Sequence, residues 1–292
     1  MNQTSVLITG ANGLVGSKFK QLYETKYQFD SLEISHPTQP IDITNLAQVQ
    51  QAFAASAAEV VVHLAAYTDV TKAWEQRDDK TGLAYQVNVM GTQNIIQAAS
   101  EFKKHLIHIS TAYVFDGKKD GLYVETDPIN PIEWYGQTKA WAEEAVQASS
   151  ISWTILRIDQ PFRSDPFPKL DLVHRIATGL KNNNLYPMFT DHFFGPTFLN
   201  DFSRVLDWSI SQKPEGVFHA TSGEKWSDYD LAQLIKEIHQ LPGEVKPGQL
   251  STYLETLNRP YQANTALNAT KLTSQINFPL HSIKAAVELV EI

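Results

Sequence analysis

Two kinds of apolar pattern alternate along the first half of this chain. Short apolar runs typical of buried strands occur at residues 5–9, 29–34, 59–64, 105–110 and 151–157. Residues 15–23, the stretch ending at 53, 85–102 and 135–148 have the spacing of about 3.6 residues found in amphipathic helices. Strands joined by crossover helices form a parallel sheet with helices on both faces. The sequence therefore predicts an α/β fold with a doubly wound parallel sheet.

The second half of the chain is less regular. Residues 158–198 are rich in proline and aromatic residues, and helical spacing returns at 199–212 and 227–240, with the apolar segment GVFHATS between them. We predict a sheet-forming domain at residues 1–160 and a smaller substrate-binding region at 161–292. The alternative is that some elements of the second region return to the sheet.

Composition excludes several classes of protein. The 292 residues include no cysteine, which excludes disulfides and thiolate metal sites, and we expect no metal ligand set. The formal net charge of -8 disfavours a nucleic-acid partner. No apolar run reaches the roughly 18 residues of a membrane-spanning helix, and the N-terminal MNQTSVLITG lacks the basic start of a signal peptide. We therefore expect a soluble, cytoplasmic protein with no membrane partner.

The segment GANGLVG stands between the first predicted strand and the first predicted helix. Its glycines allow a tight turn whose backbone N–H groups approach a pyrophosphate at the positive end of the helix. An incidental glycine-rich turn is the alternative, but the position at the start of an αβ series favours a dinucleotide site. The sequence thus predicts a Rossmann domain that binds a nicotinamide dinucleotide through Gly10, Asn12, Gly13, Leu14, Val15 and Gly16.

Glu33 ends the second predicted strand. A carboxylate at this position accepts hydrogen bonds from the adenosine ribose hydroxyls and repels a 2′-phosphate, which favours NAD over NADP. A solvated glutamate at a strand end is the alternative. We predict that the cofactor is NAD or NADP, with NAD favoured.

Tyr135 and Lys139 lie four residues apart in YGQTK, at the start of a predicted helix. This spacing places both side chains on one helix face, where the Lys139 ammonium would lower the pKa of the Tyr135 phenol. An exposed pair on an amphipathic helix is the alternative. Thr111 follows the strand at 105–110, at the sheet edge that binds ligands, and its hydroxyl could bind a substrate oxygen or cap the strand. We predict that Thr111, Tyr135 and Lys139 are catalytic.

The chain resembles the extended short-chain dehydrogenases/reductases in these motifs and in Asp42-Ile43, HLAAYTDV, NVMGT and Ser110-Thr111. Within that superfamily, ISTAYVFDG, FGPTFLNDF and GVFHATSGEKWSDYDLA are most similar to the dTDP-4-dehydrorhamnose reductases. The resemblance implies that Tyr135 donates a proton to a sugar C4 carbonyl and that Lys139 also binds the nicotinamide ribose. It further implies cofactor contacts from Asp42, Ile43, Leu64, Ala65, Ala66, Tyr67, Asn88, Ser110, Tyr135 and Lys139.

The resemblance also implies a substrate site formed by Thr68, Thr111, Ala112, Gln160 and Arg259. Two of these positions depart from the family pattern. Ala112 stands where those reductases usually have an aspartate, and Gln160 stands where they usually have a tryptophan. Arg259 and the proline after it match their Arg-Pro element. We therefore expect a sugar pocket that differs from theirs.

Further candidates are histidines and phenylalanines. The predicted strands contain His63, His105, His108 and His219, which we interpret as core or supporting residues because their spacing joins them to no metal set. An aromatic cluster could stack on a nucleotide base or pack a loop onto the core; it consists of Phe189, Phe193, Phe194 and Phe198.

The sequence therefore predicts NAD(P)H-dependent reduction of a keto sugar nucleotide, with the proton supplied by Tyr135. Two alternatives stay open. One is an epimerase that retains NAD and uses the same three catalytic residues, and the other is a regulatory subunit that binds a dinucleotide without catalysis. A homodimer is the assembly that we consider.

Overall fold

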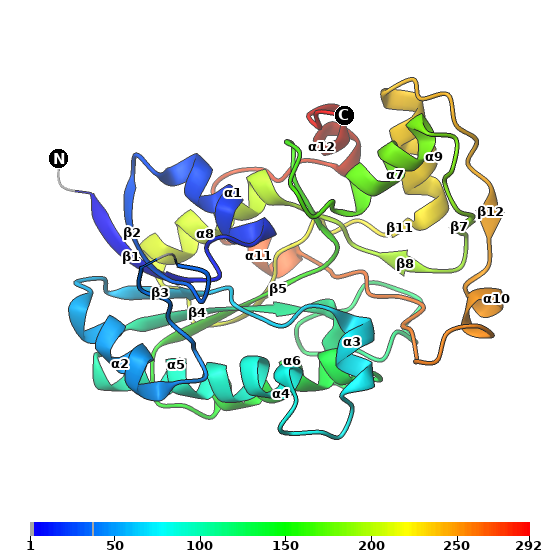
Figure 1. Ribbon diagram of the computed structural model, residues 1–292. Coiled ribbons are helices and arrows are strands. Elements are labelled where there is room, and N and C mark those ends of the chain that lie inside the picture. Colours follow the sequence, from blue (N-terminus) through cyan, green and yellow to red (C-terminus); the bar gives the residue numbers. More distant parts are fainter. Residues whose placement is uncertain (1–2, 37) are drawn as a thin grey trace.

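A parallel sheet forms the centre of the computed structural model, which describes residues 3–36 and 38–292 (Figure 1). Within these residues its strand order is β10-β5-β4-β3-β1-β2, and the pairings along it are parallel. The strands are β1 (Thr4–Thr9), β2 (Tyr27–Leu32), β3 (Val60–His63), β4 (His105–Thr111), β5 (Trp153–Ile158) and β10 (Gly216–His219). The predicted α/β fold with a doubly wound Rossmann sheet is confirmed.

Helices cover both faces of this sheet (Figure 1). Side chains alternate along β1, so that Val6 and Ile8 point to one face and Leu7 to the other. The first face packs against α1 (Leu14–Tyr23) and α8 (Leu199–Gln212). The opposite face packs against α2 (Leu46–Ala55), α5 (Thr92–Glu101) and α6 (Trp134–Gln147). Alternating apolar strand residues thus bury the sheet on both sides.

The region after residue 160 contributes to this sheet as well as to a second core. Strand β10 pairs with β5, and α8 lies beside α1 on the sheet face. The second core consists of α7 (Leu172–Lys181), α9 (Asp228–Ile238) and α12 (Ile283–Glu288), which pack around Phe162 and Phe194. Some elements of the second region therefore return to the sheet, and the boundary at residue 160 stays a prediction.

The segment predicted as one helix at 85–102 is divided. It begins with α4 (Leu83–Tyr85), continues as the π-helix η1 (Gln86–Gly91) and ends with α5. A π-helix holds more residues per turn than an α-helix, and short π segments occur often at functional sites. Apolar spacing did not reveal this segment because the residues on both sides of it are α-helical.

Short elements complete the described structure. The helices are α3 (Val70–Glu75), the 3₁₀ turn η2 (Ala112–Val114), α10 (Leu250–Leu254) and α11 (Thr270–Thr273). The strands are β6 (Pro161–Phe162), β7 (Met188–Phe189), β8 (Phe193–Phe194), β9 (Thr197–Phe198), β11 (Trp226–Ser227) and β12 (Pro247–Gly248). Among the helices that the structure describes, none has the length and apolar character needed to cross a membrane.

Candidate active site

The glycine-rich turn lies between β1 and α1, where the backbone leaves no room for side chains. Gly10 has a φ of +68°, and a Cβ atom there would lie 2.7 Å from the backbone nitrogen of Ala65. A Cβ atom on Gly16 would overlap the carbonyl oxygen of Gly10. Gly13 caps α1, so the first N–H groups of the helix face the turn. This cradle fits the pyrophosphate of a dinucleotide.

The chain after β3 is held beside this turn by side chains. The Oγ1 atom of Thr9 accepts hydrogen bonds from the backbone N–H groups of Leu64 and Ala65, at 3.1 and 3.0 Å. Asn88 on η1 accepts a hydrogen bond from the N–H of Tyr67 at 2.8 Å and donates to its carbonyl oxygen at 3.1 Å. Asn88 also donates to Thr138 on α6 at 2.9 Å. Asn88 therefore fixes the segment predicted to line the cofactor.

Glu33 lies against the glycine-rich turn. Only 7% of its surface is exposed, and its carboxylate accepts a hydrogen bond from the backbone N–H of Ala11. Burial raises the pKa of this carboxyl, and the nearby backbone N–H groups act in the opposite direction. The alternative of a solvated glutamate is therefore wrong. Further along, Asp42 accepts two hydrogen bonds from Thr44, and Ile43 is buried.

The three predicted catalytic residues come from the end of β4 and the start of α6. Tyr135 lies on the first turn of α6 and Lys139 one turn later. The helix is capped by Glu133, whose carboxylate accepts hydrogen bonds from the N–H groups of Tyr135 and Gly136, at 2.8 and 2.6 Å. The hydroxyl of Thr111 accepts a hydrogen bond from the N–H of Tyr113 at 3.2 Å and lies near enough to the Tyr135 phenol to affect its pKa. Glu133 is absent from the residues predicted above, although an acidic residue just before a predicted helix is a recognisable capping signal.

The electrostatics of this group differ from the expectation. Burial and the charge of Glu133 raise the pKa of Tyr135, and the nearby Thr111 hydroxyl opposes this rise. Lys139 instead donates a hydrogen bond to the carbonyl oxygen of Ile109, at 2.8 Å, and burial lowers the pKa of Lys139 to about 8. The prediction that the pKa of Tyr135 is lowered is therefore wrong for this structure. A phenol of raised pKa retains its proton until a strong base, such as a developing alkoxide, lies beside it.

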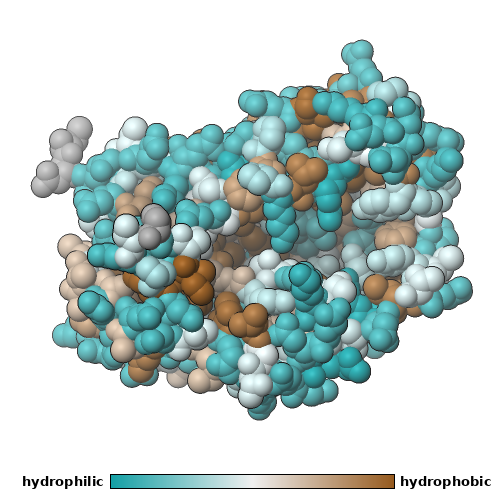
Figure 2. Space-filling model, viewed as in Figure 1, coloured by the Kyte–Doolittle hydropathy of each residue, from teal (hydrophilic) through white to brown (hydrophobic). Residues whose placement is uncertain are grey.

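A residue from the second region reaches this group. The guanidinium of Arg259 lies over the ring of Tyr261 at 4.7 Å, and its Nε atom is buried with no hydrogen-bond partner in residues 3–36 and 38–292. Burial raises the pKa of Tyr113 and Glu133, and the charge of Arg259 opposes both shifts. The Tyr113 ring lies 5.9 Å from that of Tyr135. Figure 2 shows that the face of the molecule seen in Figure 1 is hollowed near its centre.

Asp159 is a buried carboxylate that no sequence motif marks. One oxygen accepts hydrogen bonds from the N–H of Gly195 at 3.0 Å and from Thr265 at 2.7 Å. The other oxygen has no partner in the described part of the chain, and burial raises the pKa of Asp159 to about 7. Only its surroundings distinguish this residue, since an aspartate after a strand is common.

The remaining predicted substrate residues differ in how far they are exposed to solvent. Ala112 is fully buried and packs against Val114 and Phe115 in a core cluster, so its methyl group offers no surface to a substrate in this conformation. Thr68 is exposed. Gln160 is half-buried with a φ of +37°, in the left-handed region.

The additional histidines and aromatic residues are largely interior. All four histidines predicted as core or supporting residues are buried: His63, His105, His108 and His219. Phe194 and Phe198 are buried in the second core, so base stacking by these two is wrong, whereas Phe189 and Phe193 are half-buried. No group of three or more potential metal-binding side chains occurs among the described residues.

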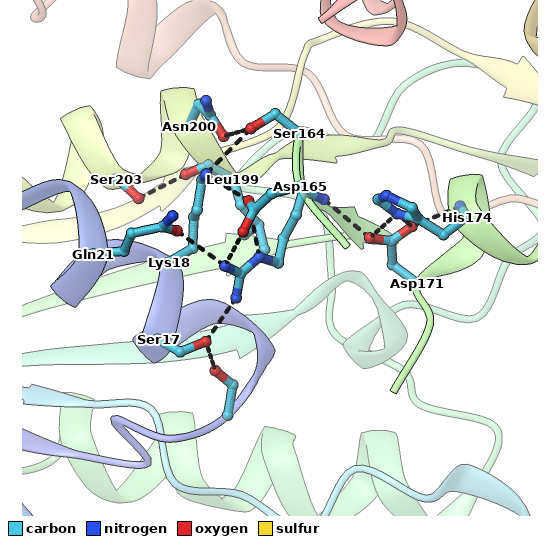
Figure 3. Close-up of polar contacts among 12 residues, drawn as sticks. Ser17, Lys18, Gln21, Ser164, Asp165, Asp171, His174, Leu199, Asn200 and Ser203 are labelled. Atoms are coloured by element: carbon cyan, nitrogen blue, oxygen red, sulfur yellow. Dashed lines mark hydrogen bonds and ion pairs between the residues drawn. The ribbon is translucent and has the colours of Figure 1, made fainter. Parts of the chain in front are cut away.

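A polar network ties α1 to the segment after β6. Asp165 accepts hydrogen bonds from Lys18 and Arg163, both at 2.6 Å. Arg163 also donates to Ser17 at 2.7 Å and Gln21 at 3.0 Å, on the same helix face as Lys18. Figure 3 shows Ser17, Lys18 and Gln21 pointing from α1 toward Asp165. The helix that begins at the glycine-rich turn is thereby anchored to the region after residue 160.

The parallel sheet, the glycine cradle and the Tyr135–Lys139 pair define an extended short-chain dehydrogenase/reductase. A family model described as the RmlD substrate binding domain matches residues 4–291, and the chain belongs to this family. It is 32% identical over 281 residues to a dTDP-4-dehydrorhamnose reductase of Aggregatibacter actinomycetemcomitans, with 91% of each chain covered.

Solved structures share the fold. A dTDP-4-dehydrorhamnose reductase of Bacillus anthracis, in complex with NADP, is similar with a TM-score of 0.88 and 24% identity over 98% of both chains. A UDP-glucose 4-epimerase of Thermus thermophilus, in complex with NAD, is similar with a TM-score of 0.81 and 19% identity, over 98% of this chain and 97% of the other. The same fold therefore accommodates both dinucleotides.

Proposed function

We propose that this protein reduces the keto group of a sugar nucleotide, with dTDP-4-dehydrorhamnose as the specific substrate. The observation that carries the proposal is that Thr111, at the end of β4, lies with Tyr135 and Lys139 of α6 at the sheet edge where the glycine cradle follows the parallel strand β1. The related reductase of Aggregatibacter actinomycetemcomitans supports the choice of substrate. Arg259 supports a site for an anionic substrate, because its guanidinium lies over the ring of Tyr261 and its charge acts on Tyr113.

The chemistry divides between the cofactor and the side chains. A bound reduced nicotinamide supplies the hydride. Thr111 would hydrogen-bond the substrate carbonyl oxygen, and Tyr135 would donate its proton to this oxygen as negative charge develops there. Lys139 would stabilise the resulting phenolate through its positive charge. The glycine cradle and the Leu64–Tyr67 segment would hold the dinucleotide in place.

We propose a preference for NADH over NADPH on the basis of Glu33. Its buried carboxylate at the end of β2 would repel a 2′-phosphate. The charge of Lys20 opposes the effect of burial on the pKa of Glu33 and so favours the ionised carboxylate. We also propose a homodimer, to be tested by light scattering, and a cytoplasmic location stays a prediction.

The direct test combines the purified protein with dTDP-4-dehydrorhamnose and either NADH or NADPH. We expect loss of reduced dinucleotide, measured by absorbance, together with formation of the reduced sugar nucleotide, measured by chromatography. Interconversion of sugar nucleotides without net oxidation would instead identify an epimerase. Binding of the dinucleotide with no turnover of any keto sugar nucleotide would identify a regulatory subunit.

A further inference from the structure

Two buried histidines lie side by side in the sheet, next to Lys139, and the proposed reaction gives them no role. His63 on β3 and His108 on β4 are paired in the register of the sheet, and their rings lie 5.3 Å apart. Both are buried, with His108 fully enclosed. Burial lowers the pKa of His63 to about 3 and that of His108 well below its usual value, so both rings are neutral near pH 7.

The contacts determine which nitrogen of His108 carries the proton. The Nζ atom of Lys139 lies 3.3 Å from Nε2 of His108 and 2.8 Å from the carbonyl oxygen of Ile109. An ammonium has only N–H donors, so Nε2 must accept and the proton of the neutral ring lies on Nδ1. This Nδ1 atom is buried without a hydrogen-bond partner in the described residues. An unpaired buried donor is costly, so packing alone does not account for a histidine here.

His63 has the opposite tautomer by the same reasoning. The hydroxyl of Thr92 donates to the carbonyl oxygen of Asn88 at 2.7 Å, so it accepts from Nε2–H of His63 at 3.1 Å. Nδ1 of His63 is then an acceptor for the hydroxyl of Thr9, at 2.7 Å. The Oγ1 atom of Thr9 in turn accepts hydrogen bonds from the backbone N–H groups of Leu64 and Ala65. His63 thus supports the backbone beside the glycine turn, whereas His108 contacts the catalytic lysine.

We propose that His108 is a positioning residue for Lys139. The lone pair on Nε2 of His108 keeps the lysine ammonium charged and oriented at the active site. This inference rests on the proposed catalytic roles of Tyr135 and Lys139. Burial lowers the pKa of Lys139 to about 8, and the charge of Glu143 opposes this shift. An acceptor bound to the ammonium also favours the charged form. Without it, Lys139 would lose its proton at a lower pH.

Few other side chains around Lys139 could stabilise its charged form. Tyr135 and Glu143 lie on α6 with it, and Glu143 forms a buried ion pair with Arg157 on β5. From the sheet, His108 and the more distant His63 face it, and both are neutral. Removal of the His108 ring therefore removes the side-chain acceptor that contacts the Lys139 ammonium, and should directly lower the pH at which Lys139 loses its proton.

The test is the pH dependence of kcat/KM for three variants. His108→Leu removes the acceptor, His108→Asn leaves a polar group too short to reach Nζ, and His108→Gln returns an oxygen near the position of Nε2. In the Leu and Asn variants we expect the alkaline limb to move to lower pH by about one unit, the effect of one hydrogen bond to a charge. The Gln variant should stay within a few tenths of a unit of the wild type, and the KM for the dinucleotide should be unchanged.

The matched control is His105→Leu, which removes another buried histidine of β4 that contacts Ser152 and Thr154 instead of Lys139. This variant should keep the wild-type pH profile. A wild-type profile in folded His108→Leu or His108→Asn, or equal shifts in the Gln and Leu variants, would overturn the proposal.

A second measurement needs no variant of the pair. Nitrogen NMR of the wild-type histidine rings should show the proton of His108 on Nδ1 and that of His63 on Nε2. A proton on Nε2 of His108 would overturn the proposal, because this nitrogen could not then accept from Lys139.

Lys139→Met distinguishes failure of the proposed catalytic role of Lys139 from failure of the positioning role of His108. Normal turnover in that variant removes the proposed catalytic role, whereas lost turnover with unshifted His108 variants removes only this inference.

Discussion

At the scale of single residues, Tyr135 offers the clearest test of the chemistry. Tyr135→Phe removes the hydroxyl and retains the ring that packs beside Tyr113. Since general acid catalysis commonly contributes 10²–10⁴-fold, we expect kcat to fall by about a hundredfold or more. Dinucleotide affinity, measured by fluorescence titration, should remain near that of the wild type. Turnover close to the wild-type value would remove Tyr135 from the mechanism.

Two variants of Glu33 distinguish the effect of its negative charge on cofactor preference from the effect of its hydrogen bond with Ala11 on stability. Glu33→Gln retains an oxygen for the N–H of Ala11 but removes the negative charge, so efficiency with NADPH relative to NADH should rise roughly tenfold, equal to about 1.4 kcal/mol. Glu33→Ala should give a similar change in preference and also lower the thermal midpoint, because the turn loses its acceptor. An unchanged ratio of the two kcat/KM values in the Gln variant would place the carboxylate outside the cofactor site.

At the scale of elements, the polar network between α1 and the segment after β6 fixes the position of α1. Burial alone would raise the pKa of Asp165, but hydrogen bonds from Arg163 and Lys18 and their charges hold it at about 2, below the ordinary 3.8. The contribution of Asp165 to stability is therefore complete above pH 3.8 and is lost as the pH falls through about 2.

Asp165→Asn should lower the free energy of unfolding near pH 7 by on the order of 2 kcal/mol, since it leaves the buried Lys18 and Arg163 without a counter-charge. Urea denaturation at several pH values measures this, and the difference from the wild type should shrink between about pH 4 and pH 2. Glu59→Gln, which removes an exposed ion pair with Lys213, is the control and should change stability little at any pH. A pH-independent difference for Asp165→Asn would contradict the electrostatic explanation.

At the scale of the whole molecule, both regions contribute residues to the proposed active site, and the balance of cofactor and product tests how that site works. The charge of Arg259, from the second region, acts on Tyr113 and Glu133 from the first. As a reductase, the protein should release its dinucleotide after each reaction and should purify largely free of it. We expect equal amounts of NADH oxidised and sugar nucleotide reduced, measured by absorbance and chromatography. Tightly bound NAD in the supernatant of denatured protein, together with sugar interconversion, would contradict a reductase.

The sequence by itself determined the features that depend on local spacing. Strand and helix periods predicted the sheet and its helices, GANGLVG predicted the cradle, and the four-residue spacing of Tyr135 and Lys139 placed them on one face of α6. Only the tertiary structure decided that β10 and α8 return to the first domain. It alone also showed that Lys139 contacts His108, that the charge of Arg259 acts on Tyr113, and that burial raises the pKa of Tyr135. These features depend on contacts between distant segments and on exclusion of water, and neither leaves a periodic signal along the chain.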